Sequence, residues 1–335
     1  MKENINNNNA EKVCAVVVSY NRKKLLIECL GALLRQTIPL AAIYLIDNAS
    51  TDGTPELLKE NGYILDKQVH NLTKPCENEF DINNFTGKEP IKFFYVRMNE
   101  NTGGAGGFYE GIKRAYEKGY DWLWLMDDDA EAKEDCLENL LNYKNADAGC
   151  LCPIIIGKDG EWENYHNKII NKLIVSDVPI ADNLNDLKNI VDIEANAFVG
   201  PLIKSDIIKK VGYPIKELFI WGDDTEFTFR ISRIAKILLC KKAVIFHKDE
   251  KIKEGSVNTQ SLWKEYYYFK NRFLFIRKYY PYNFAAYFYL SYKSLRRSAS
   301  LFIKHKVYGK EFTNALRGLK DGMLGRMPKP EKPNK

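Results

Sequence analysis

Residues 122 to 129 read Trp-Leu-Trp-Leu-Met-Asp-Asp-Asp, an apolar run that ends in three consecutive carboxylates. The apolar part predicts a buried strand. The acids repel one another, because the effective dielectric constant near a protein surface is only about 20. Oxygen ligands of this kind suit hard divalent cations such as Mg²⁺. The run therefore predicts a divalent metal site at the end of a strand.

Strand and helix signals alternate on the N-terminal side of this run. Strands are expected at 13–19, 42–46 and 92–97, and helices at 23–36, directly after 51–55, and at 107–118. Each connection is long enough for a β-α-β unit, so the sequence predicts an α/β fold with a parallel sheet. The segment 66–90 shows no period and is expected to be an irregular insertion, either at the functional rim or as a tolerated surface loop.

The composition indicates a large folded chain. At 335 residues with 45% hydrophobic content it can bury a substantial core, and we expect one large domain with an appended part. The seven cysteines include no Cys-x-x-Cys pair and follow no secretory signal, which indicates reduced thiols in a cytoplasmic protein. Residues 1–12 are polar and Asn-rich and are expected to form a flexible leader. No window of 18 apolar residues predicts a membrane span.

Polar residues follow three of the expected strands. They are Ser19-Tyr20-Asn21-Arg22, Asp47-Asn48 and Asp127-Asp128-Asp129. Ligands of open parallel sheets bind beyond the carboxyl ends of the strands, so these groups should face one cleft. Tyr20 can stack against a base, and Asp47 or Asn48 can bond to a pyrimidine edge. Alternatively, these residue types simply form turns and caps.

A glycine run, Gly103-Gly104-Ala105-Gly106-Gly107, follows the strand expected at 92–97. Without side chains, its backbone amides can approach a phosphate at the start of a helix, and Asn99 and Asn101 add donors nearby. The run can equally be a tight turn. It does not match the dinucleotide-binding pattern or the P-loop.

The second half of the chain contains another acidic pair, Asp223-Asp224, at the start of a helix expected to reach about Ala235. Either acid can be a catalytic group or merely the N-cap of that helix. A strand expected at 237–246 leads into His247, a possible metal ligand, although a lone histidine is more often structural. His166 and the other two histidines lie in polar surroundings.

Three amphipathic helices are expected near the C-terminus, at 262–280, 283–303 and 308–324. From residue 293 onward there are 12 Lys or Arg against 3 Asp or Glu. Such helices can lie on an anionic membrane surface. Alternatively, they form an ordinary subdomain packed on the sheet with a solvated basic face. Nucleic-acid binding is a poorer explanation, because the aromatic residues keep helical spacing.

Seven motifs occur in an order that resembles the inverting family-two glycosyltransferases of GT-A fold, and within them the bacterial galactofuranosyltransferase and rhamnosyltransferase branch. The resemblance covers about residues 13–280. It rests on Val-Val-Ser-Tyr-Asn-Arg (17–22), Ile-Asp-Asn-Ala-Ser-Thr-Asp-Gly-Thr (46–54), Asn-Thr-Gly-Gly-Ala-Gly-Gly-Phe (101–108), Met-Asp-Asp-Asp (126–129), Trp-Gly-Asp-Asp-Thr-Glu-Phe (221–227), Ile-Phe-His (245–247) and Tyr-Tyr-Tyr-Phe-Lys-Asn-Arg (266–272).

The resemblance implies a Rossmann-like GT-A domain at 13–260, with a nucleotide-sugar half at about 13–130 and an acceptor half at about 131–260, and a helical extension at 261–335. It implies metal-dependent, inverting transfer of galactofuranose or rhamnose from a UDP- or dTDP-sugar to a glycan or polyprenyl-linked glycan in cell-surface polysaccharide synthesis. Such an enzyme would lie on the inner face of the cell membrane. The resemblance fixes no oligomeric state.

The resemblance also implies residue roles. Asp129, Asp127 and His247 would hold Mn²⁺ or Mg²⁺ through a D-x-D element, and Asp224 would be the catalytic base. Trp221 and Asp223 would contact the acceptor. The donor would contact Ser19, Tyr20, Arg22, Asp47, Asn48, Asn101, Gly103, Gly104, Gly106, Asp127 and Asp128. The chain departs from the family at Asp47-Asn48, where many members have two acids.

Two rival functions stay open. One is a noncatalytic nucleotide-sugar-binding or scaffold protein of the same fold. The other is a nucleotidyltransferase, although such an enzyme would carry glycine right after its first strand, where this chain has Tyr20-Asn21-Arg22-Lys23.

Overall fold

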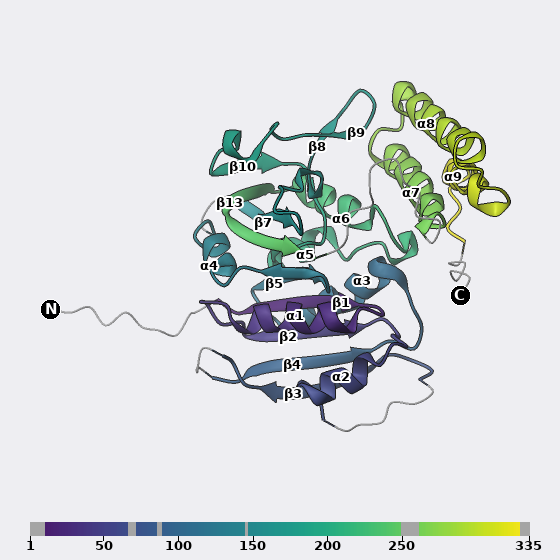
Figure 1. The fold of residues 1–335 in the computed structure, drawn as a ribbon. Helices are drawn as coiled ribbons and strands as arrows, with labels where there is room; N and C mark the ends of the chain where they lie inside the picture. Colours follow the sequence, from purple (N-terminus) through teal and green to yellow (C-terminus); the bar gives the residue numbers. More distant parts are fainter. Residues whose placement is uncertain (1–10, 66–71, 86–88, 145–146, 249–260, 329–335) are drawn as a thin grey trace.

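The computed structural model describes residues 11–65, 72–85, 89–144, 147–248 and 261–328, so most of the expected leader lies outside the described residues. A ten-stranded mixed sheet runs through the molecule in the order β10-β13-β7-β12-β5-β1-β2-β4-β3, with β6 paired to β13 (Figure 1). A second, three-stranded sheet has the order β11-β8-β9. The strands are β1 Val13–Ser19, β2 Ala42–Asp47, β3 Cys76–Ile82, β4 Ile91–Arg97, β5 Trp122–Asp127, β6 Ala130–Ala132, β7 Ala148–Gly157, β8 Asn167–Asn171, β9 Ser176–Val178, β10 Ile190–Ile193, β11 Ala195–Asn196, β12 Leu202–Lys204 and β13 Lys236–His247.

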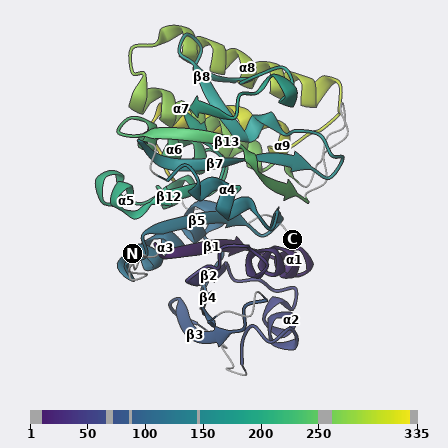
Figure 2. The same cartoon turned by 90° about the vertical axis from the view of Figure 1, so that its left-hand side faces the viewer.

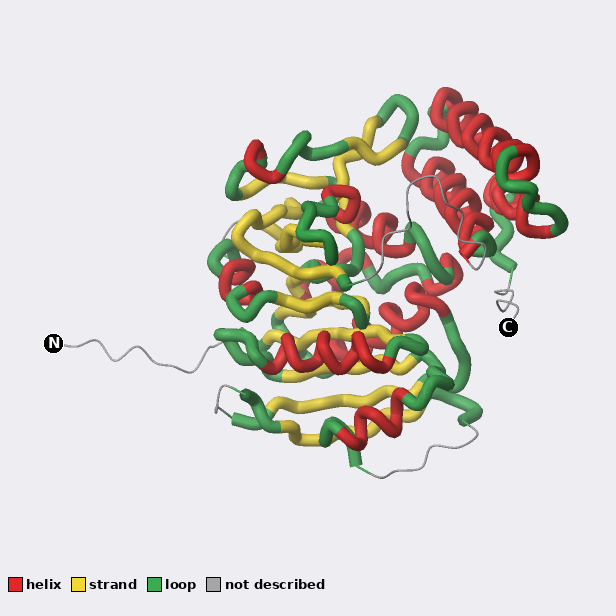
Figure 3. The backbone as a smooth tube through the Cα atoms, viewed as in Figure 1, coloured by secondary structure: helices red, strands yellow, loops and turns green. Residues whose placement is uncertain are grey.

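Nine α-helices and three short 3₁₀ turns belong to the described part of the chain (Figure 3). The helices are α1 Lys23–Leu34, α2 Thr54–Glu60, α3 Gly103–Glu117, α4 Cys136–Leu141, α5 Ser205–Val211, α6 Asp223–Ser232, α7 Lys264–Tyr279, α8 Phe284–Ile303 and α9 Lys310–Met323. The 3₁₀ turns are η1 Asn164–His166, η2 Leu184–Asp186 and η3 Lys216–Leu218.

Most strands of the large sheet run in one direction. Strands β4, β2, β1 and β5 are mutually parallel. β12 is antiparallel to both β5 and β7, which makes β7 parallel to β5, and β13 is parallel to β7. The carboxyl ends of β1, β2, β4, β5 and β13 therefore meet at one edge, as expected from the sequence.

The segment 66–90 is not wholly irregular, which corrects the sequence-based expectation. It contains β3, an antiparallel edge strand paired to β4 through Phe80 and Phe93. Polar side chains dominate β3 because an edge strand is solvated, and this composition concealed the strand. Glu77 forms an ion pair of 2.6 Å with Arg114 of α3. Residues 66–71 and 86–88 lie outside the described residues.

Helices cover both faces of the large sheet (Figure 2). α1, α2 and α4 pack on one face through Leu30, Leu58 and Leu137, among others. α3, α5 and α6 cover the other face. All seven cysteines are free, in agreement with the expectation of reduced thiols.

Helix α3 begins at Gly103, one turn earlier than the sequence suggested. Most of the glycine run is thus the first turn of a helix and not a loop. The reason is close packing: a Cβ at Gly107 would lie 2.5 Å from Val18 Cγ1 of β1. Only glycine lets the helix approach the sheet so closely.

The C-terminal helices form a bundle at the carboxyl edge of the sheet, to the right in Figure 1. Phe229 of α6 joins Phe273 and Phe275 of α7, Leu290 of α8 and Leu319 of α9 in a third core. The C-terminal helices thus pack against α6 and the three-stranded sheet, which is the packing expected in the alternative to membrane attachment. Among the described residues, no helix is both long and apolar enough to cross a membrane.

Candidate active site

A cavity of about 430 Å³ lies at the edge where the strand ends meet. Its lining includes most of the site residues expected from the sequence, drawn from six separate parts of the chain: Tyr20, Arg22, Asn48, Asn101, Gly103, Gly104, Asp127, Asp128, Asp129, Trp221, Asp223, Asp224 and His247. Ser19, Asp47 and Gly106 do not line it. We call this the first cavity.

The three aspartates at the end of β5 are closely packed. Asp128 and Asp129 are buried. Burial and the charges of Asp129 and Asp128 raise the pKa of Asp127, and burial with the charge of Asp129 raises that of Asp128 to about 7. The guanidinium of Arg22 pairs with Asp129 and lies 3.8 Å from Asp128. The cluster therefore attracts positive charge, as the sequence suggested.

Asp129 and His247 face each other across a gap. Asp129 Oδ1 is buried, has no hydrogen-bond partner among the residues that the structure describes, and lies 3.6 Å from His247 Nε2. That separation is too long for a hydrogen bond. It is a separation that two ligands can have when each lies about 2.1 Å from a common cation. The residues present therefore fit a divalent metal ion.

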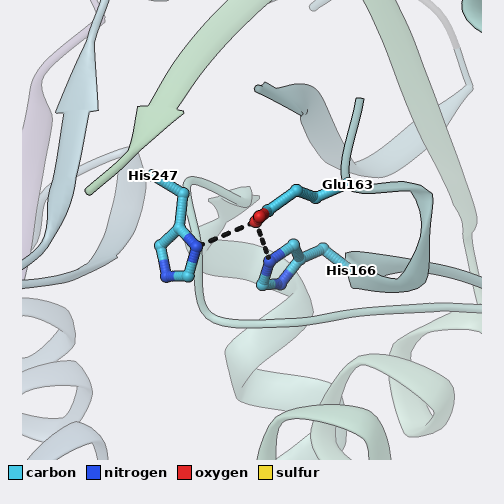
Figure 4. Close-up of side chains that lie close together, drawn as sticks. All are labelled: Glu163, His166 and His247. Carbon is cyan, nitrogen blue, oxygen red and sulfur yellow. Dashed lines mark hydrogen bonds and ion pairs between the residues drawn. The ribbon is translucent and has the colours of Figure 1, made fainter. Parts of the chain in front are cut away.

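The second nitrogen of His247 is held by a residue that sequence reasoning did not identify. Glu163 lies 2.8 Å from His247 Nδ1 and 3.1 Å from His166 Nε2, so its carboxylate sits between the two imidazoles (Figure 4). Burial alone would raise the pKa of Glu163, but hydrogen bonds from His166, Tyr165 and His247 lower it to about 2. Burial would lower the pKa of His247, but Asp129 and Glu163 raise it to about 9. These three residues are also close enough to form a metal-binding group by themselves.

The end of β2 is bound tightly into the fold. Asp47 is fully buried and accepts hydrogen bonds from Tyr95 Oη (2.7 Å) and Ser50 N (2.8 Å), besides pairing with Arg97. Its carboxylate shapes the turn below the first cavity. Asn48, which does line the cavity, donates to Gly103 O at 2.9 Å and so fixes the start of α3.

Only part of the glycine run faces the first cavity. Gly103 has φ of +72°, and a Cβ there would lie 2.0 Å from Phe219 O. A Cβ at Gly106 would meet Thr102 at 2.4 Å. Gly104, by contrast, lines the cavity, and its nearest neighbour would be Asp223 Oδ2 at 3.8 Å. Close packing explains Gly103 and Gly106, and Gly104 is the member that leaves room for a ligand.

The acidic pair Asp223-Asp224 opens α6, but neither residue is its N-cap. Gly222, with φ of +99°, occupies that position, so the N-cap alternative is wrong. Burial and the charge of Asp224 raise the pKa of Asp223 to about 8. Asp224 is half-buried, and its Oδ1 accepts from Thr225 N at 2.5 Å.

The loop before Asp223 is fixed by hydrogen bonds from helix α7. Phe219 and Trp221 have positive φ values of 69° and 60°, a conformation that costs energy for such residues. Asn271 Nδ2 of α7 donates to the carbonyls of Leu218 (3.0 Å), Ile220 (3.0 Å) and Trp221 (2.8 Å). The role of Asn271 was not expected, although the residue lies in a motif that carried the resemblance.

A second cavity of about 680 Å³ adjoins the first. Both are lined by Asp127, Trp221, Asp224 and His247. The remaining walls of the second cavity come from η1, β8, β9, α7 and α8, including Tyr165, Lys168, Asp177, Arg272 and Lys293. Asp224 thus lies where the first and the second cavity meet.

Comparison with known proteins shows the family to which the chain belongs. The model of glycosyl transferase family 2 matches residues 14–78 and 81–199, more than half of the chain. The chain belongs to glycosyl transferase family 2. This confirms the resemblance seen in the sequence motifs.

Two curated relatives of this family member carry the names expected for the branch. Galactofuranosyltransferase GlfT1 of Mycolicibacterium smegmatis is 28% identical over 228 residues, which cover 67% of this chain and 66% of that protein. The dTDP-rhamnosyl transferase RfbF of Shigella flexneri is 25% identical over 233 residues, 67% of this chain and 73% of that protein. The match thus spans about two thirds of GlfT1.

Solved structures of low identity share the fold. GalNAc-T7, crystallised with UDP, GalNAc and Mn²⁺, superposes with a TM-score of 0.60 at 17% identity, covering 97% of this chain and 59% of that one. S. aureus TarS 1–349 in complex with UDP gives a TM-score of 0.54 at 14% identity, covering 93% and 80%. The expected GT-A fold with added C-terminal helices is therefore confirmed.

Proposed function

We propose that the chain is a metal-dependent, inverting glycosyltransferase that moves a sugar from a pyrimidine nucleotide sugar to a glycan acceptor. The observation that carries the proposal is the position of Asp224, which lines both cavities. The donor would bind in the first cavity and the acceptor in the second. Family membership and the names of the relatives support this proposal over a nucleotidyltransferase or a noncatalytic scaffold.

Asp127, Asp129 and His247 would hold a divalent cation, Mn²⁺ or Mg²⁺, beside the donor. The unpartnered Asp129 Oδ1 supports this assignment, as does the raised pKa of Asp127. When bound, such an ion neutralises the charge that develops on the leaving diphosphate. The structural relative GalNAc-T7 was crystallised with UDP and Mn²⁺.

Asp224 would take the proton from the acceptor hydroxyl as that hydroxyl attacks the anomeric carbon. Its Oδ1 is held by the amide of Thr225, which fixes the carboxylate at the meeting point of the cavities. Attack from the face opposite the leaving group inverts the anomeric centre in one displacement. Trp221, 42% exposed, offers a flat apolar surface for a sugar ring, and Asp223 lies beside it.

The base of the donor would lie by Tyr20 and Asn48, and its diphosphate by Arg22, Asn101 and Gly104. Tyr20 is 39% exposed and so has a free face for stacking. The relatives' names favour UDP-galactofuranose or dTDP-rhamnose as donor. The same names make a glycan, free or linked to a polyprenyl carrier, the proposed acceptor.

A panel of nucleotide sugars with product detection by mass tests this function. We expect one pyrimidine nucleotide sugar to give a glycosylated product and free UDP or dTDP, with the anomeric configuration inverted. Formation of a nucleotide sugar from a sugar phosphate would instead establish a nucleotidyltransferase. Failure of every donor to react or bind would contradict the proposal.

The outer side of α8 would rest on an anionic membrane. Phe284 and Phe288 are each 77% exposed and Ile303 is 74% exposed, although all three are large and apolar. Phe284 and Phe288 are four residues apart and so lie on one face of α8, and Arg296 and the C-cap residue Lys304 are also exposed. An apolar strip with basic neighbours suits the interface of an anionic bilayer.

Flotation with phosphatidylglycerol-containing vesicles tests this surface. We expect the wild type to float and the double variant Phe284→Asn, Phe288→Asn to remain in solution. Leu65→Asn is the matched control, because Leu65 is 73% exposed and follows α2, which lies far from α8 (Figure 1). Equal flotation of the double variant and the wild type would refute membrane contact through α8.

A further inference from the structure

At one end of the second cavity, the positively charged side chains outnumber the carboxylates. Asp177 of β9 forms an ion pair of 3.0 Å with Arg272 of α7. Burial would raise the pKa of Asp177, but the charges of Arg272, Lys168 and Lys293 lower it below its usual value. Asp177 is therefore paired with Arg272, while Lys168 and Lys293, whose charges also act on it, line the same cavity.

The two lysines are hydrogen-bonded to hydroxyl groups in the described part of the chain. Lys168 Nζ donates to Thr225 Oγ1 at 2.6 Å, and Lys293 Nζ lies 3.4 Å from Tyr268 Oη. Within the described residues, neither lysine has a carboxylate partner inside 4.0 Å. Both lysines are half-buried. Salt and water therefore screen their charges less than they would on an open surface.

The charged group lies close to the proposed base. Lys168 bonds to Thr225, the residue after Asp224, and Thr225 Oγ1 also donates to Asp224 Oδ1 at 3.1 Å. The neighbouring pair Arg297–Glu265, by contrast, is already neutral. An anion bound at Lys168 and Lys293 would thus belong to the molecule whose hydroxyl reaches Asp224.

We propose that the acceptor carries an anionic oxygen group, a phosphate or a carboxylate, and that Lys168, Arg272 and Lys293 bind it in the second cavity. This inference rests on the proposed function, because it assigns the second cavity to the acceptor. The cations would orient the acceptor so that one hydroxyl lies beside Asp224. They would also select against neutral glycans.

The test compares three probes that share one scaffold: octyl glucoside, octyl glucuronide and octyl glucoside 6-phosphate. Binding is measured by saturation-transfer NMR with UDP and Mg²⁺ at saturation, so that the donor cavity is filled. We expect at least one anionic probe to bind about tenfold more tightly than octyl glucoside, the size of effect of one charge-assisted hydrogen bond. The better anionic probe identifies the group as carboxylate or phosphate.

Lys293→Gln should reduce this preference to less than about threefold and leave the affinity for octyl glucoside unchanged. Arg296→Gln is the matched control, because Arg296 lies on the same helix but is exposed and does not line the cavity. Equal affinity for neutral and anionic probes, or an unchanged preference in Lys293→Gln, would overturn the inference.

A second measurement distinguishes an error in the proposed anion site from an error in the proposed sugar transfer. Hydrolysis of the donor with water as acceptor, measured in the wild type, reports the proposed reaction without any acceptor. If no donor reacts but the anion preference depends on Lys293, the anion site stands and the proposed reaction is wrong. If a donor reacts and the preference is absent, only the anion site is wrong.

Discussion

Replacement of Glu163 by glutamine should weaken metal binding although it removes none of the three proposed ligands, Asp127, Asp129 and His247. Glu163 is 2% exposed and lies 2.8 Å from His247 Nδ1, which leaves Nε2 directed towards Asp129. A carboxylate behind a metal-binding histidine fixes the ring and increases its basicity, and losing it costs about 10- to 100-fold in metal affinity. That factor corresponds to about 1.4–2.7 kcal/mol, in the range of one hydrogen bond to a charged group.

The assay is a titration of the protein with Mn²⁺, followed through the electron paramagnetic resonance signal of the free ion, so it does not depend on the donor. Glu161→Gln serves as the control, because Glu161 is exposed two residues away. Glu163→Gln should shift the dissociation constant by about 10- to 100-fold, and the control should leave it unchanged. Unchanged Mn²⁺ affinity in a folded Glu163→Gln would refute the reasoning that His247 is a ligand held by Glu163.

Three further results are expected. EDTA should stop sugar transfer and added Mn²⁺ or Mg²⁺ should restore it, measured as nucleotide release; full activity in the chelator would speak against the metal site. Asn271→Ala removes an amide whose two N–H protons are shared among three backbone carbonyls and should lower the free energy of unfolding in urea by roughly 1–3 kcal/mol, whereas Asn314→Ala, whose two bonds are longer at 3.3 and 3.4 Å, should cost less. Gly107→Ala should cost about 1–3 kcal/mol by overpacking against Val18, while Gly104→Ala in the same helix, with its nearest contact at 3.8 Å, should not; equal urea midpoints would show that α3 can shift away from β1.

The sequence was sufficient to predict strands β1, β2, β4, β5 and β13 of the large sheet and the edge where their carboxyl ends meet, but it did not reveal β6, β7, β10 or β12. Buried strands such as β1 and β5 are continuous apolar runs, and their polar ends must lie together once the strands are parallel. The edge strand β3 was missed because its solvated side chains weaken the alternation on which such predictions rest. The start of α3 was misplaced because four of its first five residues are glycines, which oppose helix formation unless packing demands them.

The partners of the site were harder to predict than its ligands. Glu163 and His166 belong to a short 3₁₀ turn with no strand-end pattern, and only their spacing of three residues could have suggested that they share a ligand or a proton. Asn271 acts through backbone carbonyls more than 45 positions away in the chain, which no local pattern encodes. The second cavity depends on how α7 and α8 dock against β8 and β9, and that is a tertiary property.

The most direct test of the account is the effect of Asp224→Asn on sugar transfer and on donor binding, measured in the same preparation. Asp206→Asn is the matched control, since Asp206 is an exposed acid in the first turn of α5. Loss of a general base should lower kcat by at least about 100-fold while the dissociation constant for the nucleotide sugar stays within about twofold. Transfer within about tenfold of the wild-type rate in Asp224→Asn would contradict the assignment of Asp224 as the base.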